Sequence, residues 1–324
     1  MGKSLLEYAA WLDERKLLWP ACPDRVVPKA QPYLKPLANI RGVVWNLYGT
    51  LLFICDGKLL QQHPQQMRMQ VALEKTIQEF NMWQSMSRKP GQPWEYMLQL
   101  YNREIEDRQM KASPRKGEAV EVDSAEVWKA LIEKLGKKEY TWDVDLYGDL
   151  DDYAEKVAYF FHSCLQGVAA APNALETLML IFNGGFMQGM ATNTQVFSLA
   201  QLLRTINPSG GPLALGDLFL PSCITQSYRF GVKQPSALLM ESCAEQYSRQ
   251  GLEPREIAVV GTRVHEELAP AKKLGFRVIL YAGDKHSLQA SSSDMKDEAV
   301  RPDRILTDLL QLRDVLFPDP PEQA

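Results

Sequence analysis

The chain has few cysteines and little net charge, and these shortages exclude several classes of protein. Its five cysteines are widely spaced over 324 residues, and no two of them form a CxxC pair. An odd number at such spacing disfavours a disulfide framework and a zinc site, so we expect reduced thiols that are mostly packed in the interior. The formal net charge of -4 is too small to favour nucleic acid as a partner.

Long apolar runs are also absent. No stretch approaches the roughly 18 uninterrupted apolar residues of a membrane span, and the opening MGKSLLEYAAWLDERK carries acids without a long apolar leader. We therefore expect a cytoplasmic protein with no membrane partner. With 45% hydrophobic and 23% charged residues, the chain can bury a full core, and its length suits about two domains.

Strand and helix patterns alternate at both ends of the chain, whereas the middle is helical. A helix is expected over residues 4–17, followed by an irregular proline-rich segment and by a buried strand in IRGVVWNL. Residues 60–167 carry apolar positions at helical spacing, which predicts an all-helical insert. Its charge-rich stretch 111–123 is predicted to be a solvated loop.

After residue 170 the alternation resumes. Helical patterns in NALETLMLIFNGG, TQVFSLAQLLRTI, QPSALLMESCAEQYSRQG, HEELAPAKKLG and ILTDLLQLRDVL separate strand patterns in FMQGMATN, LGDLFLPSCIT, EIAVVG and FRVILYAG. Such units predict an α/β fold with a doubly wound, mostly parallel sheet covered on both faces. The predicted domains are an N-terminal extension (1–37), an α/β core (38–58 and 168–316), an inserted all-helical cap (59–167) and a tail (317–324).

Ligands of such sheets bind at the carboxyl ends of the strands, where the strand order reverses. Those ends read NLYGT, ATN, GVKQP and GTRVHEE in this sequence. Their order and spacing resemble the haloacid dehalogenase (HAD) superfamily of phosphatases, dehalogenases and phosphomutases over residues 38–316. The resemblance implies a Rossmann-like core with a helical cap, and hydrolysis in two steps through a covalent intermediate on an aspartate.

The first motif of that family is a hydrophobic strand followed by Asp-x-Asp-Gly-Thr. Here Asn46 and Tyr48 stand at the two aspartate positions, and Gly49 and Thr50 are kept. An amide oxygen is a poor nucleophile, and a phenol with an ordinary pKa of about 10 is a poor base at neutral pH. The ring of Tyr48 is also large enough to fill the place of a phosphate. Gly49 and Thr50 suit a sharp turn, in which the Thr50 hydroxyl is expected to bond to local backbone.

The second and third motifs are partly kept. Thr192 and Asn193 match the second motif, Gln234 stands at the lysine position of the third, and Lys233 lies one residue early. In the family the threonine and lysine hold the phosphoryl charge. A threonine that ends a strand also has an ordinary structural role. For Lys233 two interpretations stay open: it replaces the missing ammonium, or it points to solvent.

The fourth motif bears on metal binding. Thr262 and Glu267 stand where the family has two acids. Magnesium prefers octahedral oxygen ligands that include one or two carboxylates. Since Asn46 and Thr262 are neutral, only Glu267 remains acidic, and we expect neither a metal nor another cofactor.

The side chains that remain at the strand ends still allow the binding of a small anion. Arg263 beside a helix start, together with Thr192, Asn193 and Lys233, forms the predicted anion site. His265 has no second His or Cys at ligand spacing and is interpreted as a surface histidine.

Two functional hypotheses follow. Asn46, Tyr48, Thr192 and Gln234 are degenerate catalytic positions, and the chain has no GxSxG, GxxxxGK[ST] or HExxH motif, and no GxGxxG after a strand, to replace them. We therefore expect a catalytically inactive or severely impaired, pseudophosphatase-like protein that binds a protein partner or a small anion. The alternative is an active HAD-family hydrolase of phosphate esters that uses Mg²⁺ and gives Lys233, Glu267 or Tyr48 non-standard roles. The aromatic residues predicted mainly to form the core of the cap are Trp83, Trp94, Tyr96, Tyr101, Trp128, Tyr159 and Phe160.

Overall fold

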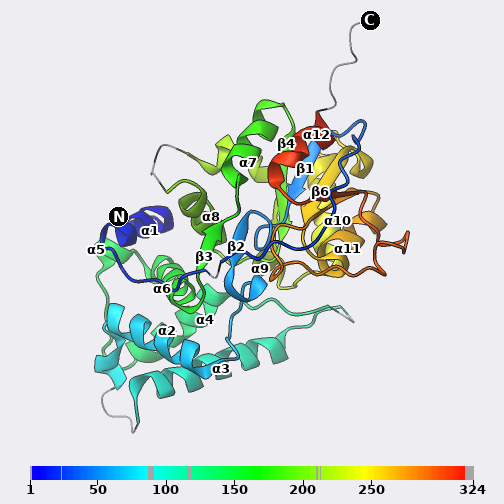
Figure 1. Cartoon of the computed structure of the whole chain (residues 1–324). Coiled ribbons are helices and arrows are strands. Elements are labelled where there is room, and N and C mark those ends of the chain that lie inside the picture. Colours follow the sequence, from blue (N-terminus) through cyan, green and yellow to red (C-terminus); the bar gives the residue numbers. More distant parts are fainter. Residues whose placement is uncertain are drawn as a thin grey trace, which may run out of the picture.

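The structure is a computed structural model, and it describes residues 2–22, 24–86, 91–115, 118–208, 211 and 213–317. A six-stranded sheet forms its centre (Figure 1), with the strand order β5-β4-β1-β6-β7-β8. Every neighbouring pair in this sheet is parallel. The strands are β1 (Gly42–Trp45), β4 (Met187–Thr192), β5 (Ile224–Gln226), β6 (Ile257–Gly261), β7 (Arg277–Tyr281) and β8 (Arg304–Leu306).

Helices cover both faces of the sheet. Val43 and Trp45 of β1 pack in one hydrophobic cluster with α7, α8 and α12, and Val44 packs in another with α10 and α11. Alternate side chains of the central strand thus enter opposite layers, as the pleat of a strand requires. The predicted doubly wound α/β fold is confirmed. These helices are α7 (Ala174–Asn183), α8 (Ser198–Ile206), α10 (Ala237–Ser248), α11 (Ala269–Lys273) and α12 (Leu312–Leu316).

The predicted helical cap lies between β2 (Leu52–Ile54) and β3 (Val168–Ala170), which pair antiparallel as a small second sheet. In Figure 1 its helices gather below the central sheet. They are α2 (Gln66–Glu79), α3 (Pro93–Lys111), α4 (Ser124–Gly136), α5 (Val144–Tyr147) and α6 (Leu150–Leu165). The exact domain boundaries stay a prediction.

Most of the aromatic residues predicted for the cap core do lie in it. Tyr101, Trp128, Tyr159 and Phe160 are buried, and Trp94 and Tyr96 pack partly buried against them, whereas Trp83 is half exposed.

The N-terminal extension joins the cap to the core. Helix α1 (Leu5–Glu14) begins with a capping box, in which Ser4 Oγ accepts from Glu7 N and the Glu7 carboxylate accepts from Ser4 N. Tyr8 and Leu12 of α1 enter the same hydrophobic cluster as the cap helices and Phe197 of the core. Because one cluster contains all three parts, α1 fixes the cap beside α8.

Three local predictions need correction. The stretch ILTDLLQLRDVL is no single helix, since Ile305 and Leu306 belong to β8 and only Leu312–Leu316 is α-helical. The stretch HEELAPAKKLG begins with a π-helical turn, Val264–Leu268, before α11. The stretch LGDLFLPSCIT holds two 3-10 turns before the short β5.

The remaining short elements are η1 (Cys55–Gly57), η2 (Met82–Met86), η3 (Leu215–Asp217), η4 (Pro221–Cys223), α9 (Ser227–Phe230), η5 (Pro254–Glu256) and η7 (Leu309–Gln311).

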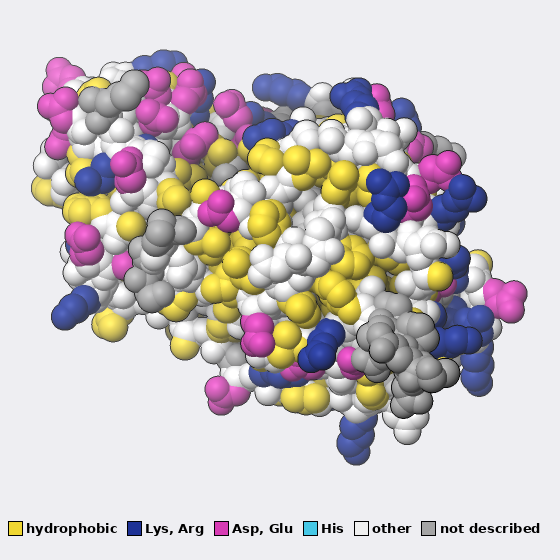
Figure 2. Space-filling view, turned by 90° about the horizontal axis from the view of Figure 1, so that it is seen from above, with side chains coloured by type: hydrophobic (Ala, Val, Ile, Leu, Met, Phe, Trp, Pro, Cys, Tyr) yellow, Lys and Arg dark blue, Asp and Glu magenta, His cyan; other side chains and the backbone are white. Residues whose placement is uncertain are grey.

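The surface carries charges of both signs, and the cysteines are reduced, as the composition predicts. On the face drawn in Figure 2, hydrophobic side chains gather across the middle, and charged side chains of both signs lie around the edge. All five cysteines are free and four of them are buried, which confirms the prediction of packed thiols. Within the described residues, no helix has both the length and the apolarity to cross a bilayer.

Candidate functional site

The motif segments meet at the carboxyl ends of β1, β4 and β6, where the strand order reverses. They line a cavity of about 380 Å³, which we call the strand-tip cleft. Both the core and the cap contribute to it. The described residues that line it are Asn46, Tyr48, Lys58, Leu59, Leu60, Gln61, Gln62, Gln109, Ala119, Glu121, Thr192, Asn193, Gln195, Lys233, Gln234, Arg263, Glu266 and Glu267.

Asn46 occupies the nucleophile position directly after β1. Its backbone N–H donates to Val260 O at 3.0 Å, which continues the β1–β6 ladder. The side chain is 1% exposed, and its Nδ2 has no hydrogen-bond partner among the described residues. A Cβ at Gly261 would lie 3.0 Å from that nitrogen, so the amide is packed against backbone. The cleft therefore presents a neutral amide where a hydrolase of this family needs an ionised carboxylate.

Tyr48 stands at the acid/base position of the first motif, but its hydroxyl bonds to helix α8. Its ring packs in the hydrophobic layer with α7, α8 and α12, and its hydroxyl lies 3.0 Å from Ser198 Oγ and 2.7 Å from Gln201 Oε1. Burial raises the pKa of Tyr48 above its ordinary value. A phenol held in these bonds is no general base at neutral pH. The ring forms part of the wall and leaves the cavity open, so the expectation that it fills the phosphate place needs correction.

The turn after β1 depends on Gly49. Its φ is +93°, and a Cβ there would lie 2.9 Å from Thr262 Oγ1. The glycine is thus required by conformation and by space. The Thr50 hydroxyl was expected to bond to local backbone, but its Oγ1 has no hydrogen-bond partner in the described part of the chain. That expectation is wrong, because the side chain is enclosed by the turn without reaching a carbonyl.

The second and third motifs bond mainly to each other. Thr192 Oγ1 accepts from Leu47 N at 3.0 Å, and Asn193 Oδ1 accepts from Gln234 N at 2.8 Å. Gln234 Nε2 donates to Ala191 O at 3.0 Å. These contacts favour a structural role for the three side chains. The hydroxyl hydrogen of Thr192 and the amide hydrogens of Asn193 stay available to an acceptor in the cleft.

Glu267, the one acid kept at a motif position, is fully bonded within the chain. Its Oε2 accepts from Thr262 N at 2.7 Å and from Arg263 N at 3.0 Å, and its Oε1 pairs with Arg263 Nη1 at 3.0 Å. The side chains of Arg263 and Glu267 are 5% and 1% exposed. Burial raises the pKa of the Glu267 carboxyl, and the guanidinium opposes that rise.

The Arg263–Glu267 pair opposes the binding of a divalent cation at Glu267. Arg263 also donates through Nη2 to Gly57 O, so its charge is fixed beside the carboxylate. A divalent cation at Glu267 would have to displace this guanidinium or lie next to it. Across the described residues, no group of three or more His, Cys, Asp or Glu side chains is placed to hold a metal ion. Magnesium does not fit the donor set of this site.

The charge-rich segment 111–123 is only in part the solvated loop that was predicted: residues 111–115 are mostly exposed, whereas Glu121 and Val122 are buried. Glu121 enters the strand-tip cleft and its side chain is 4% exposed. Its Oε1 lies 3.0 Å from Gln195 Nε2 and 3.5 Å from Lys233 Nζ, and its Oε2 accepts from Ser227 Oγ at 2.8 Å. Burial raises the pKa of Glu121, and Lys233 opposes the rise. Residues 116–117 of the segment lie outside the described residues.

Main-chain bonds hold this segment in place. Val120 and Val232 form an antiparallel bridge, Glu121 N donates to Gly231 O at 2.9 Å, and Lys233 N donates to Ala119 O at 2.8 Å. The cap is thus bonded to the loop of the third motif directly beside the cleft. Lys233 consequently lines the cleft, with its side chain 34% exposed and paired with Glu121, and the choice between its two interpretations stays a prediction.

Glu121 is the main residue of the strand-tip cleft that the sequence analysis missed. The signal available was the short apolar alternation around it, since Val120 and Val122 flank the glutamate as in a half-buried strand. The charges on either side outweighed that pattern. His265 is placed as predicted, exposed and bonded through Nε2 to Asp294 Oδ1 at 2.9 Å.

Comparison with known proteins agrees with this architecture. Residues 232–312, from the third motif to the end of the sheet, match the family model described as HAD-hydrolase-like, which confirms the predicted resemblance. No curated protein matches the chain.

The solved structures to which the chain is similar include both dehalogenases and phosphatases. The chain is similar to a 2-haloacid dehalogenase from Pseudomonas syringae pv. Tomato DC3000, with 17% identity, a TM-score of 0.48 and coverage of 85% of this chain and 97% of the other. A HAD phosphatase from Thermococcus onnurineus has 16% identity, a TM-score of 0.44 and coverage of 85% and 96%. An L-2-haloacid dehalogenase from Xanthobacter autotrophicus has 20% identity, a TM-score of 0.39 and coverage of 84% and 96%.

Proposed function

We propose that this chain is a non-catalytic, pseudophosphatase-like member of the HAD-like hydrolases whose strand-tip cleft binds a small anion. The observation that carries the proposal is the Arg263–Glu267 pair beside the amide of Asn46. Together they leave the cleft without a free carboxylate at the motif positions, which both nucleophilic attack and magnesium binding require.

Each step of family hydrolysis lacks its group here. Asn46 provides no charged oxygen to attack phosphorus, and Tyr48 is bonded to α8 with a raised pKa, so neither attack nor proton transfer has an agent. Gln234 donates to a backbone carbonyl and carries no charge for a phosphoryl group.

A small anion is proposed as the ligand because a carboxylate of the chain itself, that of Glu121, already occupies the cleft. The Glu121 carboxylate accepts from Ser227 and Gln195 and faces Lys233, which are the contacts an external oxyanion would need. Thr192 and Asn193 offer further donors nearby. Arg263, part of the anion site predicted from the sequence, is left out of the proposed ligand set because Glu267 neutralises it. An anion would bind by displacing Glu121 from Lys233.

The enzymatic alternative is tested with p-nitrophenyl phosphate and Mg²⁺. We expect no metal-dependent turnover by the natural protein. The variant Glu267→Gln is the matched control, since activity that survives this change comes from a contaminant. Turnover by the natural protein that is lost in Glu267→Gln would establish an active hydrolase and overturn the proposal.

Restoring the family's residues at the four motif positions tests whether those substitutions alone remove the activity. The variant Asn46→Asp, Tyr48→Asp, Gln234→Lys, Thr262→Asp regains the side chains of the family, but Arg263 still neutralises Glu267 and Glu121 still faces Lys233. We expect it to stay inactive. Activity in this variant would show that Asn46, Tyr48, Gln234 and Thr262 alone silence the site.

The anion is tested by calorimetric titration with sulfate. We expect Glu121→Gln to bind sulfate about tenfold or more tightly than the natural protein, because Lys233 loses its internal partner. Lys233→Met should remove the binding in either background. Equal sulfate affinity in the natural protein and in Glu121→Gln would contradict the displacement.

A further inference from the structure

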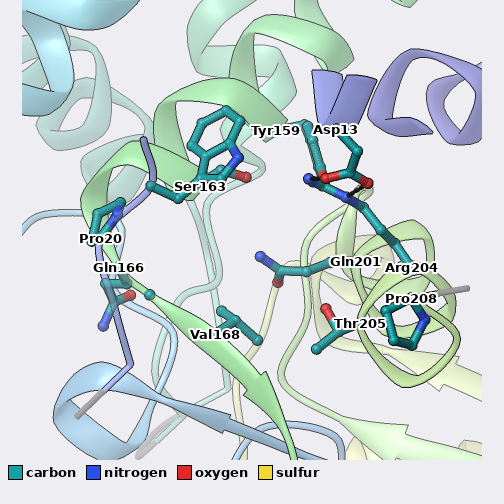
Figure 3. Close-up of a pocket in the computed structure, with 12 residues that line it drawn as sticks. Asp13, Pro20, Tyr159, Ser163, Gln166, Val168, Gln201, Arg204, Thr205 and Pro208 are labelled. Carbon is teal, nitrogen blue, oxygen red and sulfur yellow. Dashed lines mark hydrogen bonds and ion pairs between the residues drawn. The ribbon is translucent and has the colours of Figure 1, made fainter. Parts of the chain in front are cut away.

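A second cavity, of about 420 Å³, lies between the cap helix α6, the core helix α8 and the N-terminal extension (Figure 3). We call it the α6–α8 pocket. Three parts of the chain that are far apart in sequence build it, and none of the family motifs lies in its wall. A volume in this range suits a small molecule.

The charges in the wall of this pocket cancel. Arg204 binds both carboxylate oxygens of Asp13 and also donates to the hydroxyl of Tyr159 (Figure 3). The guanidinium is therefore already paired with a carboxylate of this chain. A charged ligand would enter without a free countercharge and would lose its hydration, which is costly. The wall thus selects a neutral molecule.

Unpaired polar groups face the same space. Gln201 is 6% exposed, and its Oε1 accepts from the Tyr48 hydroxyl. No described residue accepts from its Nε2, and in Figure 3 the amide reaches toward Val168 and Gln166 across the cavity. The hydroxyl of Thr205, one helical turn on, likewise has no protein partner in the described ranges and lies at the pocket wall. The Gln201 amide nitrogen is open to the cavity, where it is free to donate to an acceptor on a ligand.

The rest of the wall is aromatic and apolar. Trp19 lines the pocket, and Arg204 Cζ lies 6.0 Å from the centroid of its ring. Phe160 packs edge-on to Trp19 with a centroid distance of 5.4 Å, which fixes the orientation of the indole. A rigid aromatic surface opposite amide and hydroxyl groups suits a ligand with one apolar face and several acceptors.

We propose that the α6–α8 pocket binds a neutral polyhydroxy ligand of the size of a pyranose sugar. The ring face of such a molecule packs on Trp19, and its hydroxyl oxygens accept from Gln201 Nε2 and bond to the Thr205 hydroxyl. The ligand needs no charge, in agreement with the Arg204–Asp13 pair. This site is separate from the strand-tip cleft and does not depend on its proposed function.

The test is saturation-transfer NMR and calorimetry on the full chain with D-glucose and N-acetyl-D-glucosamine, and with adenosine as a planar comparison. We expect at least one of the two sugars to bind. Thr205→Val should weaken that binding about tenfold, as the loss of one hydrogen bond to the ligand implies, and Gln201→Leu should weaken it further. Thr141→Val, an exposed site outside the pocket, is the matched control and should bind normally.

Three results would overturn the proposal. They are the absence of sugar binding up to about 50 mM, binding of adenosine alone, and sugar binding that Thr205→Val leaves unchanged. If Gln201→Leu unfolds because Tyr48 loses its acceptor, the Thr205→Val result decides by itself.

Discussion

Arg263→Met is expected to destabilise the fold by removing the partner of a buried charge. Arg263 Nη1 lies 3.0 Å from Glu267 Oε1, and the two side chains are 5% and 1% exposed. Breaking such a pair typically costs about 3–5 kcal/mol, because the remaining charge is left uncompensated. Glu267 keeps the backbone donors of Thr262 and Arg263, so we expect the lower end, about 3 kcal/mol in the free energy of unfolding.

The loss should depend on pH. Burial already raises the pKa of Glu267 above the ordinary value of 4.5, and the variant loses the guanidinium that opposes the rise. A carboxyl whose pKa is raised in the folded state destabilises the fold at pH values above that pKa, and this penalty vanishes as the pH falls below the unfolded value. The deficit of Arg263→Met relative to the natural protein should therefore shrink between neutral pH and a pH near 4.5.

Urea unfolding followed by circular dichroism measures both effects. The matched control is Glu266→Gln, because Glu266 lies 3.7 Å from Arg263 Nε and its side chain is 36% exposed. We expect this control to lose less than about 1 kcal/mol. In Arg263→Met/Glu267→Gln the buried charge is gone, and most of the stability should return. The reasoning is refuted if Arg263→Met loses no more than the control, or if the double variant is as unstable as the single one.

Three further predictions concern the cleft and its turn. Tyr48→Phe should lower the free energy of unfolding by about 1–2 kcal/mol, since Gln201 Oε1 loses its donor, and an unchanged urea midpoint would disprove this. Gly49→Ala should cost more than Gly185→Ala in the same assay, because both residues have positive φ but only Gly49 has neighbours within 4 Å of the added Cβ, and equal losses would contradict it. Sulfate affinity should rise as the pH falls toward the raised pKa of Glu121, and a rise of the same size in Glu121→Gln would exclude that carboxyl as the cause.

The fold was predictable because local pattern and topology agree in the core. The run GVVW is apolar throughout, as expected for a strand covered on both faces, and it does form the central β1. Parallel strands bring their carboxyl ends to one edge, so Asn46 and Thr192 were expected to meet, and both line the strand-tip cleft. Strand β8 was missed because its three residues are too few to show a period beside a helical stretch.

The content of the cleft was less predictable, because it depends on partners distant in sequence. Glu121 meets Lys233 only after the cap has folded back on the core, and a single sequence carries no sign of that pairing. Tyr48 has two directions open to it at the strand end, and the acceptors Ser198 and Gln201 on α8 decide between them. Arg263 was predicted to be a free cation although Glu267 lies four residues on, a spacing at which helical side chains pair, and the structure shows that pair buried.

Calorimetric titration of the natural protein with Mg²⁺ tests the central claim most directly. The account predicts no heat beyond dilution up to about 10 mM, because the Arg263–Glu267 pair and the amide of Asn46 leave no free carboxylate at the motif positions that would hold the metal. Saturable binding below about 1 mM that disappears in Glu267→Gln would contradict it.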